Sequence, residues 1–470
     1  MQAVLPFGLS RRLRSSEVSS CLLILGTLLL ASAREARAQD SVPAPDSTAA
    51  KAAEERPTGL PKGVQWTFNL DAGLGAFGFG NSLYTNVRPD PSGDLSDNWF
   101  ESYVKPALSG SIDLGGGSEL YGKVSVVGER TFAAPPPLVG TEAASFGPEE
   151  LNIGWRSGTS ISSSENLIDL NFGRAVYKIG HGMILWDGGA EGGSRGGFWS
   201  NARKAWALAA VARLQPKIHT FEAFYLNRNE ISGSAPNSRV WGANYQIAPD
   251  DYTVIGASYL HTLSDSNAAR NGMNVYNVRA YTAPLPMLRD LSIEAEYAYE
   301  DNGDLRKSNA WNVQVAYQLS KVDWAPKLSY RYAFFQGDDP ATSADESFDP
   351  LFPGFYDWGT WWQGEIAGEY FLSNSNLISN QVRLSLTPSE KVGTGLIGYY
   401  FQLDQPGALA PGVTSKDVVA ELDAYCDWKV NSNFTFSFIA AYANPGAAVE
   451  QAFGRTENFI YGMAYVSYSY

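Results

Sequence analysis

Histidine is the side chain best suited to acid–base catalysis near neutral pH, and the chain has three. His181 lies in a glycine-rich stretch with Asp187 and Ser194 nearby, which could form a hydrolase triad, whereas a loop histidine among glycines is the simpler interpretation. His219 and His261 fall at the ends of expected strands. The chain contains no HExxH, phosphate-binding loop, GxSxG elbow or cysteine cluster. We therefore expect no catalytic residue, no metal site and no cofactor.

Two acidic runs, 90–97 and 338–349, carry enough carboxylates to bind Ca²⁺ through oxygen ligands. Their spacing is not that of an EF-hand, and such runs are more often solvated external loops. The formal net charge is −14, and the protein is accordingly acidic.

Charged side chains also recur at every second residue of several segments, opposite an apolar face. In 291–300, Glu294 and Glu296 alternate with apolar residues, and in 417–428 Glu421 and Asp423 do the same. A charge facing lipid at mid-depth costs about 2–4 kcal/mol, so in a membrane barrel the charged face must be the lumen. This pattern places nine candidates in the pore lining: Lys123, Arg279, Glu294, Glu296, Lys327, Arg331, Arg383, Glu421 and Asp423.

Glu129, Asp169 and Glu222 are possible inward partners for these cations. Arg174 breaks the alternation, because it shares the parity of the apolar residues Ile168, Leu170 and Phe172. Either a bulge at Gly173 turns it inward, or it snorkels to the membrane interface.

The alternation predicts an all-β fold, a transmembrane antiparallel β-barrel. The stretch 324–387 shows the repeat unit: a strand, a long acidic loop, and strands again before a short turn. Nineteen strands are expected, but a bacterial single-chain barrel needs an even number, so one is wrong; we expect 18, with 16 as the alternative. The nineteen are 64–77, 101–113, 119–130, 150–156, 165–177, 205–213, 217–227, 240–248, 252–262, 274–281, 291–300, 309–319, 324–335, 361–372, 378–387, 392–403, 417–428, 434–443 and 458–470.

Arginines at 11, 12 and 14, the apolar run 21–31 and the Ala-Arg-Ala at 36–38 indicate a secretory signal peptide over 1–38. A flexible periplasmic lead, 39–61, and the barrel, 62–470, would follow. Loss of the signal peptide would change the formal charge from −14 to about −17 and leave Cys426 as the one cysteine, which excludes an intramolecular disulfide.

The 61 aromatic residues suit interfacial girdles, and no apolar run of membrane-spanning length follows the signal. A large soluble β-sandwich or propeller is the alternative. The last strand ends at Tyr470, like the C-terminal assembly signal of outer-membrane proteins. We therefore expect the protein to lie in the cell outer membrane. Its expected partners are outer-membrane lipid, lipopolysaccharide and the barrel-assembly machinery, and no binding of nucleic acid is expected.

The sequences FDPLFPG (348–354), GTWWQGE (359–365) and NSNLI (374–378) resemble the alginate-export family of outer-membrane porins. Gly173-Arg174 before a glycine-rich loop, and Glu421-Leu422-Asp423, also resemble that family over 171–470. The resemblance implies a monomeric eighteen-stranded barrel that passes an anionic exopolysaccharide outward. It also implies that Arg174 and Arg203 lie around the loop, and Arg331 and Arg383 in later strands, as pore-lining cations.

The function expected is passive passage of an anionic polysaccharide or other hydrophilic solute through a charged lumen, narrowed by the loop 178–200. Because the chain is acidic, the sequence does not establish a uniformly electropositive pore. A lumen lined by both cations and anions would suit a general diffusion porin for small solutes. An outer-membrane hydrolase and a plugged structural or adhesive barrel are the remaining alternatives.

Overall fold

The computed structural model describes residues 63–81, 97–133, 142–186, 188–231, 237–285, 287–354, 363–370, 372–454 and 456–470. The expected signal peptide, the lead and most of the acidic run 90–97 lie outside them, as does Asp187. The described residues form eighteen strands: β1 (Val64–Gly80), β2 (Asp97–Gly115), β3 (Ser118–Phe132), β4 (Ala143–Arg156), β5 (Ile168–Ala175), β6 (Trp206–Leu214), β7 (His219–Asn227), β8 (Arg239–Asp250), β9 (Thr253–Leu263), β10 (Asn274–Thr282), β11 (Leu291–Asp301), β12 (Lys307–Gln318), β13 (Lys327–Phe335), β14 (Leu377–Ser389), β15 (Val392–Gln402), β16 (Asp417–Lys429), β17 (Phe434–Pro445) and β18 (Phe459–Ser469).

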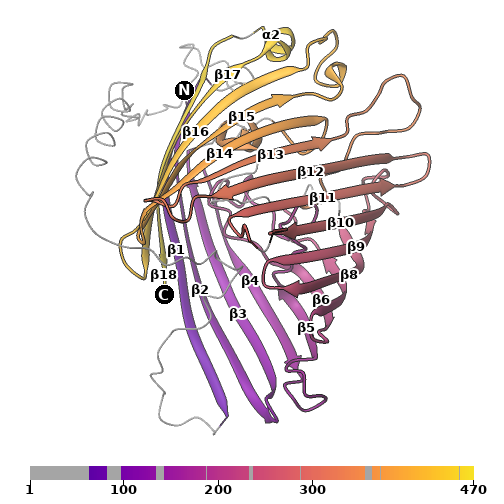
Figure 1. The fold of residues 1–470 in the computed structure, drawn as a ribbon, viewed down its shortest axis with the longest axis vertical. Coiled ribbons are helices and arrows are strands. Elements are labelled where there is room, and N and C mark those ends of the chain that lie inside the picture. Colours follow the sequence, from indigo (N-terminus) through magenta and orange to yellow (C-terminus); the bar gives the residue numbers. More distant parts are fainter. Residues whose placement is uncertain are drawn as a thin grey trace, which may run out of the picture. The chain divides into compact units, whose positions relative to one another are not determined.

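These strands close into one antiparallel barrel. Each pairs with its neighbours in sequence order, and β1 pairs with both β2 and β18 (Figure 1). Connections after even-numbered strands are mostly short, such as the two residues between β8 and β9. Connections after odd-numbered strands at the opposite end include much longer ones, above all 176–205 and 336–376. The prediction of an eighteen-stranded transmembrane barrel is confirmed.

Alternation along the strands separates the two faces as expected. On β11, the Tyr297 side chain is 42% exposed, whereas its neighbours Glu296 and Ala298 are 4% and 0% exposed. Apolar exposed side chains such as Leu328 and Val382 continue the outer face on β13 and β14. The outer surface is therefore apolar and suited to lipid, and the polar parity is turned inward.

One expected strand, 361–372, is wrong. Its described residues contain the short π-helix η2 (Gly364–Gly368) instead of a strand. Gly364 has φ of 90°, and a Cβ added there would approach the Glu421 carboxylate to 2.7 Å. The described residues Ile366, Ala367 and Tyr370 are instead buried inside the barrel. Removal of this segment leaves the even number.

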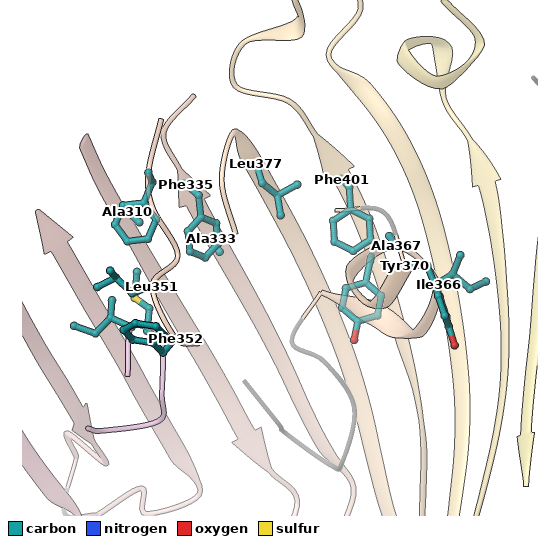
Figure 2. Close-up of a cluster of buried hydrophobic side chains, with 14 of the residues drawn as sticks. Ala310, Ala333, Phe335, Leu351, Phe352, Ile366, Ala367, Tyr370, Leu377 and Phe401 are labelled. Carbon is teal, nitrogen blue, oxygen red and sulfur yellow. The ribbon is translucent and has the colours of Figure 1, made fainter. Parts of the chain in front are cut away.

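The two long connections pack inside the barrel. We name 176–205 the first inner segment and the described part of 336–376 the second. A parallel β-bridge joins Leu185 to Phe352, and the backbone N–H of Trp186 donates to the carbonyl of Phe352 at 2.8 Å. Their apolar side chains form a buried cluster with the wall residues Phe335 and Phe401 (Figure 2). The lumen thus contains a packed core beside its polar surfaces.

Three small helical elements complete the described structure: η2, the 3-10 turn η3 (Pro406–Ala408) and α2 (Ala447–Phe453). No helix within the described ranges combines the length and the apolar character needed to cross a bilayer.

Candidate functional site

A hydrogen-bonded belt of alternating charge crosses the inner face of β3 to β7. Arg156 on β4 contacts Glu119 on β3 at 2.9 Å and Asp169 on β5 at 3.4 Å. Arg213 on β6 contacts Asp169 at 3.5 Å and Glu222 on β7 at 2.7 Å. Directly paired positions in neighbouring strands bring these side chains together, so each cation lies between two carboxylates.

The belt continues over β8 to β11 with fewer charges. Asn244 on β8 donates to Glu222 at 2.6 Å and accepts from Arg279 on β10 at 2.7 Å. Asn277, also on β10, donates to Glu296 on β11 at 2.9 Å. Three arginines and four carboxylates therefore neutralise one another almost completely along nine strands. The belt itself thus carries only one more carboxylate than arginine.

The sector β12 to β15 is different. None of these four strands, which the structure describes throughout, contains Asp or Glu. Their inner parity carries the cations Lys327, Arg331 and Arg383, with Gln314 and Gln381 directly beside Arg331 in the register. Arg383 lies over the Tyr425 ring, 5.3 Å from its centroid. These four strands, which we name the acid-free sector, thus bring three cations and no carboxylate of their own to the inner face.

Wall carboxylates hold the inner segments by their backbone. Glu101 on β2 accepts the N–H groups of Trp199 and Ser200 at 2.9 and 2.8 Å. Glu149 on β4 accepts those of Lys204 and Ala205 at 2.6 and 2.7 Å. Each acid therefore clamps two successive amides of the first inner segment.

The second inner segment is held in the same way. Glu421 on β16 accepts the N–H groups of Ile366 and Ala367 at 2.7 and 2.8 Å, and Asp423 accepts that of Glu365 at 3.2 Å. Clamping of this kind satisfies amides that a barrel interior would otherwise leave without acceptors. Four inward acids of the wall are thus committed to structure.

The expected pore-lining residues fall into distinct environments. Lys123 pairs with Glu150 at 2.8 Å, and Glu294 approaches His181 of the first inner segment at 3.2 Å. Lys327 is exposed, and Arg331 is buried. The other five candidates stand on the inner face in the contacts described above: Arg279, Glu296, Arg383, Glu421 and Asp423.

Arg203 and Arg174, the two arginines that the family resemblance placed around the loop, are held differently. Arg203 is buried in the first inner segment and donates to Glu129 at 3.0 Å. Arg174 does not stand on the inner face. In the β4–β5 register it is opposite Leu151, which is 56% exposed on the outer surface. Its guanidinium donates to the carbonyls of Pro148 and Glu149 at 3.2 and 3.3 Å.

Glu101, Glu149 and the acid-free sector were missed in the sequence. Glu101 and Glu149 give no sign of their role, because the amides that they bind lie 50 to 100 residues away. The acid-free sector, in contrast, could have been found by comparing charge strand by strand.

Outside the strands, the interior shifts the pKa of several carboxyl groups of the inner segments, among them Glu365 and Glu191. Burial first, and then the charge of Asp423, raise the pKa of Glu365 well above its usual range, although the Trp199 indole N–H opposes this. Burial and the charge of Glu129 likewise raise the pKa of Glu191. Both groups favour the protonated form more than they would in water.

The three histidines are engaged in local contacts. The His181 ring stacks on Tyr281 with centroids 4.0 Å apart, His219 contacts the Tyr245 hydroxyl at 2.9 Å, and His261 contacts Asn274 at 3.0 Å. Within the part of the chain that the structure describes, no group of His, Cys, Asp and Glu has a geometry that would hold a metal ion.

The chain is similar in fold to several solved channels. OccK8 (OprE) of Pseudomonas aeruginosa superposes with a TM-score of 0.54 at 10% identity, over 86% of this chain and 98% of that one. OccK5 (OpdH) of Pseudomonas aeruginosa gives 0.52 at 10% identity over 86% and 97%. Acinetobacter baumannii OccAB1 gives 0.52 at 11% identity over 86% and 96%. At these identities the likeness concerns the fold alone.

A comparison with curated proteins gives no match. The model of the alginate export family matches residues 199–463, more than half of the chain. This match includes the acid-free sector, the second inner segment and its clamp. The chain belongs to the alginate export family and is an outer-membrane β-barrel channel of that family.

Proposed function

We propose that the barrel lets an anionic polysaccharide pass passively through its lumen along the sector β12 to β15. One observation carries this proposal. The four strands present three inner cations, Lys327, Arg331 and Arg383, and contain no Asp or Glu. The cations attract a carboxylated polymer, and the strands that carry them add no like charge of their own.

The family membership supports this substrate class, and the closure of all eighteen strands within one chain supports a single barrel as the working unit. No catalytic step is part of the proposal. Selection would arise from the fixed charges of the lumen and from the inner segments that narrow it.

The charge-balanced belt on β3 to β11 favours a second candidate, a general diffusion porin for small hydrophilic solutes. In such a channel neither sign of charge would dominate permeation. The two functions predict different ion selectivity and are separable in one experiment.

The test is the reversal potential of the refolded barrel in a KCl gradient. We compare the wild type with a Lys327→Gln, Arg331→Gln, Arg383→Gln variant and with a control, Lys307→Gln, Lys321→Gln, Lys391→Gln, which removes the same charge from exposed positions away from the inner face. Anion preference that falls in the first variant and persists in the control supports the polyanion channel. A wild type without anion preference would leave the general porin.

A further inference from the structure

A cavity of about 530 Å³ lies on the inner face of the barrel wall from β1 to β6, next to the start of the first inner segment. Its size is within the range of about 300–1,000 Å³ typical of sites for small organic ligands. Ala175 and Tyr177 at the entrance to the first inner segment line it, together with strand residues of the charge-balanced belt. It is thus a defined space in the lumen, outside the acid-free sector.

The charges that line this cavity cancel. Three cations, Lys123, Arg156 and Arg213, stand against three carboxylates, Glu119, Glu150 and Asp169. Ion pairs at 2.8 to 3.5 Å link each cation to at least one carboxylate. A charged group that entered would meet like and unlike charges at similar distances, so the gain in attraction would be small against the cost of its desolvation.

Hydroxyl groups suit this lining better than charges do. A hydroxyl donates one hydrogen bond and accepts others, so it can bind a guanidinium N–H and a carboxylate oxygen of the same ion pair at once. The side chains of Lys123, Arg156 and Glu119 are 39%, 39% and 31% exposed. The Arg156 guanidinium also lies 4.2 Å from the centroid of the Tyr121 ring, a flat stack against which an apolar ring face can pack.

We propose that this cavity binds the uncharged, hydroxyl-rich part of a saccharide, a short stretch of sugar rings recognised by their hydroxyls. The inference rests on the proposed passage of a polysaccharide and adds a second, chemically different surface to it. β4 lies nine strands from β13 in the ring of eighteen, so this site is across the barrel from the acid-free sector. The lumen therefore offers one wall to carboxylates and the opposite wall to hydroxyls.

The test is calorimetric titration of the refolded full-length barrel, in a detergent without sugar headgroups, with the neutral trisaccharide maltotriose. Trigalacturonate serves as the charged counterpart. We compare the wild type with Asn171→Leu, which removes a lining amide, and with Glu119→Gln, which gives the lining a net positive charge. Thr387→Val, on the inner parity of β14 and outside the cavity, is the matched control.

We expect maltotriose to bind, and Asn171→Leu to weaken it by about fivefold to tenfold, the loss of roughly one hydrogen bond. Glu119→Gln should shift preference from maltotriose toward trigalacturonate, and Thr387→Val should change neither. No heat with maltotriose, or equal weakening by the control, would overturn the proposal.

Titration in detergent does not depend on conductance. A barrel that binds maltotriose yet lacks anion preference would contradict the proposed polyanion channel and support this saccharide site. A barrel with anion preference that ignores maltotriose would do the reverse.

Discussion

Ile366 donates its backbone N–H to the carboxylate of Glu421 at 2.7 Å, and this bond joins the second inner segment to the barrel wall. Alternation correctly predicts that Glu421 points inward. It gives no indication that the carboxylate binds protein instead of solute. The acids of this lumen are therefore poor guides to its selectivity until their partners are known.

Replacement of Glu421 by alanine should release η2. Two buried N–H groups, those of Ile366 and Ala367, lose their acceptor, at a cost of about 2–4 kcal/mol in the free energy of unfolding. Thermal unfolding followed by circular dichroism and proteolysis near residue 366 would measure this. Glu390→Ala, in an exposed turn, is the control for the change of charge. Equal melting of the two variants would contradict the clamp.

Arg174 is predicted to support the wall, not ion selection. β5 ends at Ala175, and its pairing with β4 stops at Arg174. There the Arg174 guanidinium donates hydrogen bonds to the carbonyls of Pro148 and Glu149 on β4. Unpaired carbonyls in a membrane cost several kcal/mol each, so Arg174→Ala should destabilise the barrel by about 2–4 kcal/mol.

Arg174→Lys should recover part of that stability, since an ammonium group still donates. The reversal potential in a KCl gradient should stay that of the wild type in both variants. A change of selectivity with unchanged stability would place Arg174 in the pore after all.

The facing of the strands follows from local pattern, whereas the count of eighteen also needed the rule that a bacterial single-chain barrel has an even number of strands. Apolar and polar residues alternate along 291–300, and this alternation shows directly which side chains face outward, since one face of the strand meets lipid and the other meets the lumen. The segment 361–372 was wrongly predicted as a strand, because its apolar residues Ile366, Ala367 and Tyr370 are buried inside the barrel, where burial does not require a strand. Nothing local distinguishes those two environments.

The site was predictable as a set of inward charges but not as a set of pairs. Lys123 and Arg279 lie on the expected face, yet the partner that decides the chemistry of each comes from another strand or segment. Arg203 shows the limit most clearly, since Glu129 precedes it by 74 residues. The placement of strands and inner segments in space, which alternation does not fix, determines these pairs.

The buried pair of Arg203 and Glu129 should behave unlike an exposed one. Their side chains are 5% and 0% exposed, so removing one partner leaves a buried charge, and Arg203→Met should cost about 3–5 kcal/mol of stability. The double variant Arg203→Met, Glu129→Gln should cost less than the sum of the two single changes, because no charge is then orphaned.

Arg130 and Glu142 provide the comparison, because their side chains are 51% and 56% exposed. Breaking that pair should change the free energy of unfolding by no more than about 1 kcal/mol. Denaturant titration of all variants in one lipid gives both double-mutant cycles. Additive losses at Arg203 and Glu129 would show that the two charges act independently.

Glu365 is predicted to make the stability of the inner segments depend on pH. Burial, and then the charge of Asp423, raise its pKa in the folded protein, whereas the unfolded chain titrates near the ordinary value of about 4.3. A raised pKa means that the folded state binds the proton more tightly, so the contribution of Glu365 is fully present below the unfolded value and is lost as the pH rises.

Glu365→Gln keeps the shape and cannot ionise, and its amide can still face Asp423 without repulsion. The variant should therefore be more stable than the wild type at pH 8, by on the order of 1 kcal/mol or more, and the two should converge near pH 4. Thermal unfolding of both proteins at pH 4, 6 and 8 measures the difference, in which other titrating groups largely cancel. Glu390→Gln, at an exposed turn, should show no such divergence. If Glu365→Gln were instead less stable at pH 8, the ionised carboxylate would be a favourable partner of the Trp199 indole, and its bond at 3.2 Å would outweigh the repulsion from Asp423.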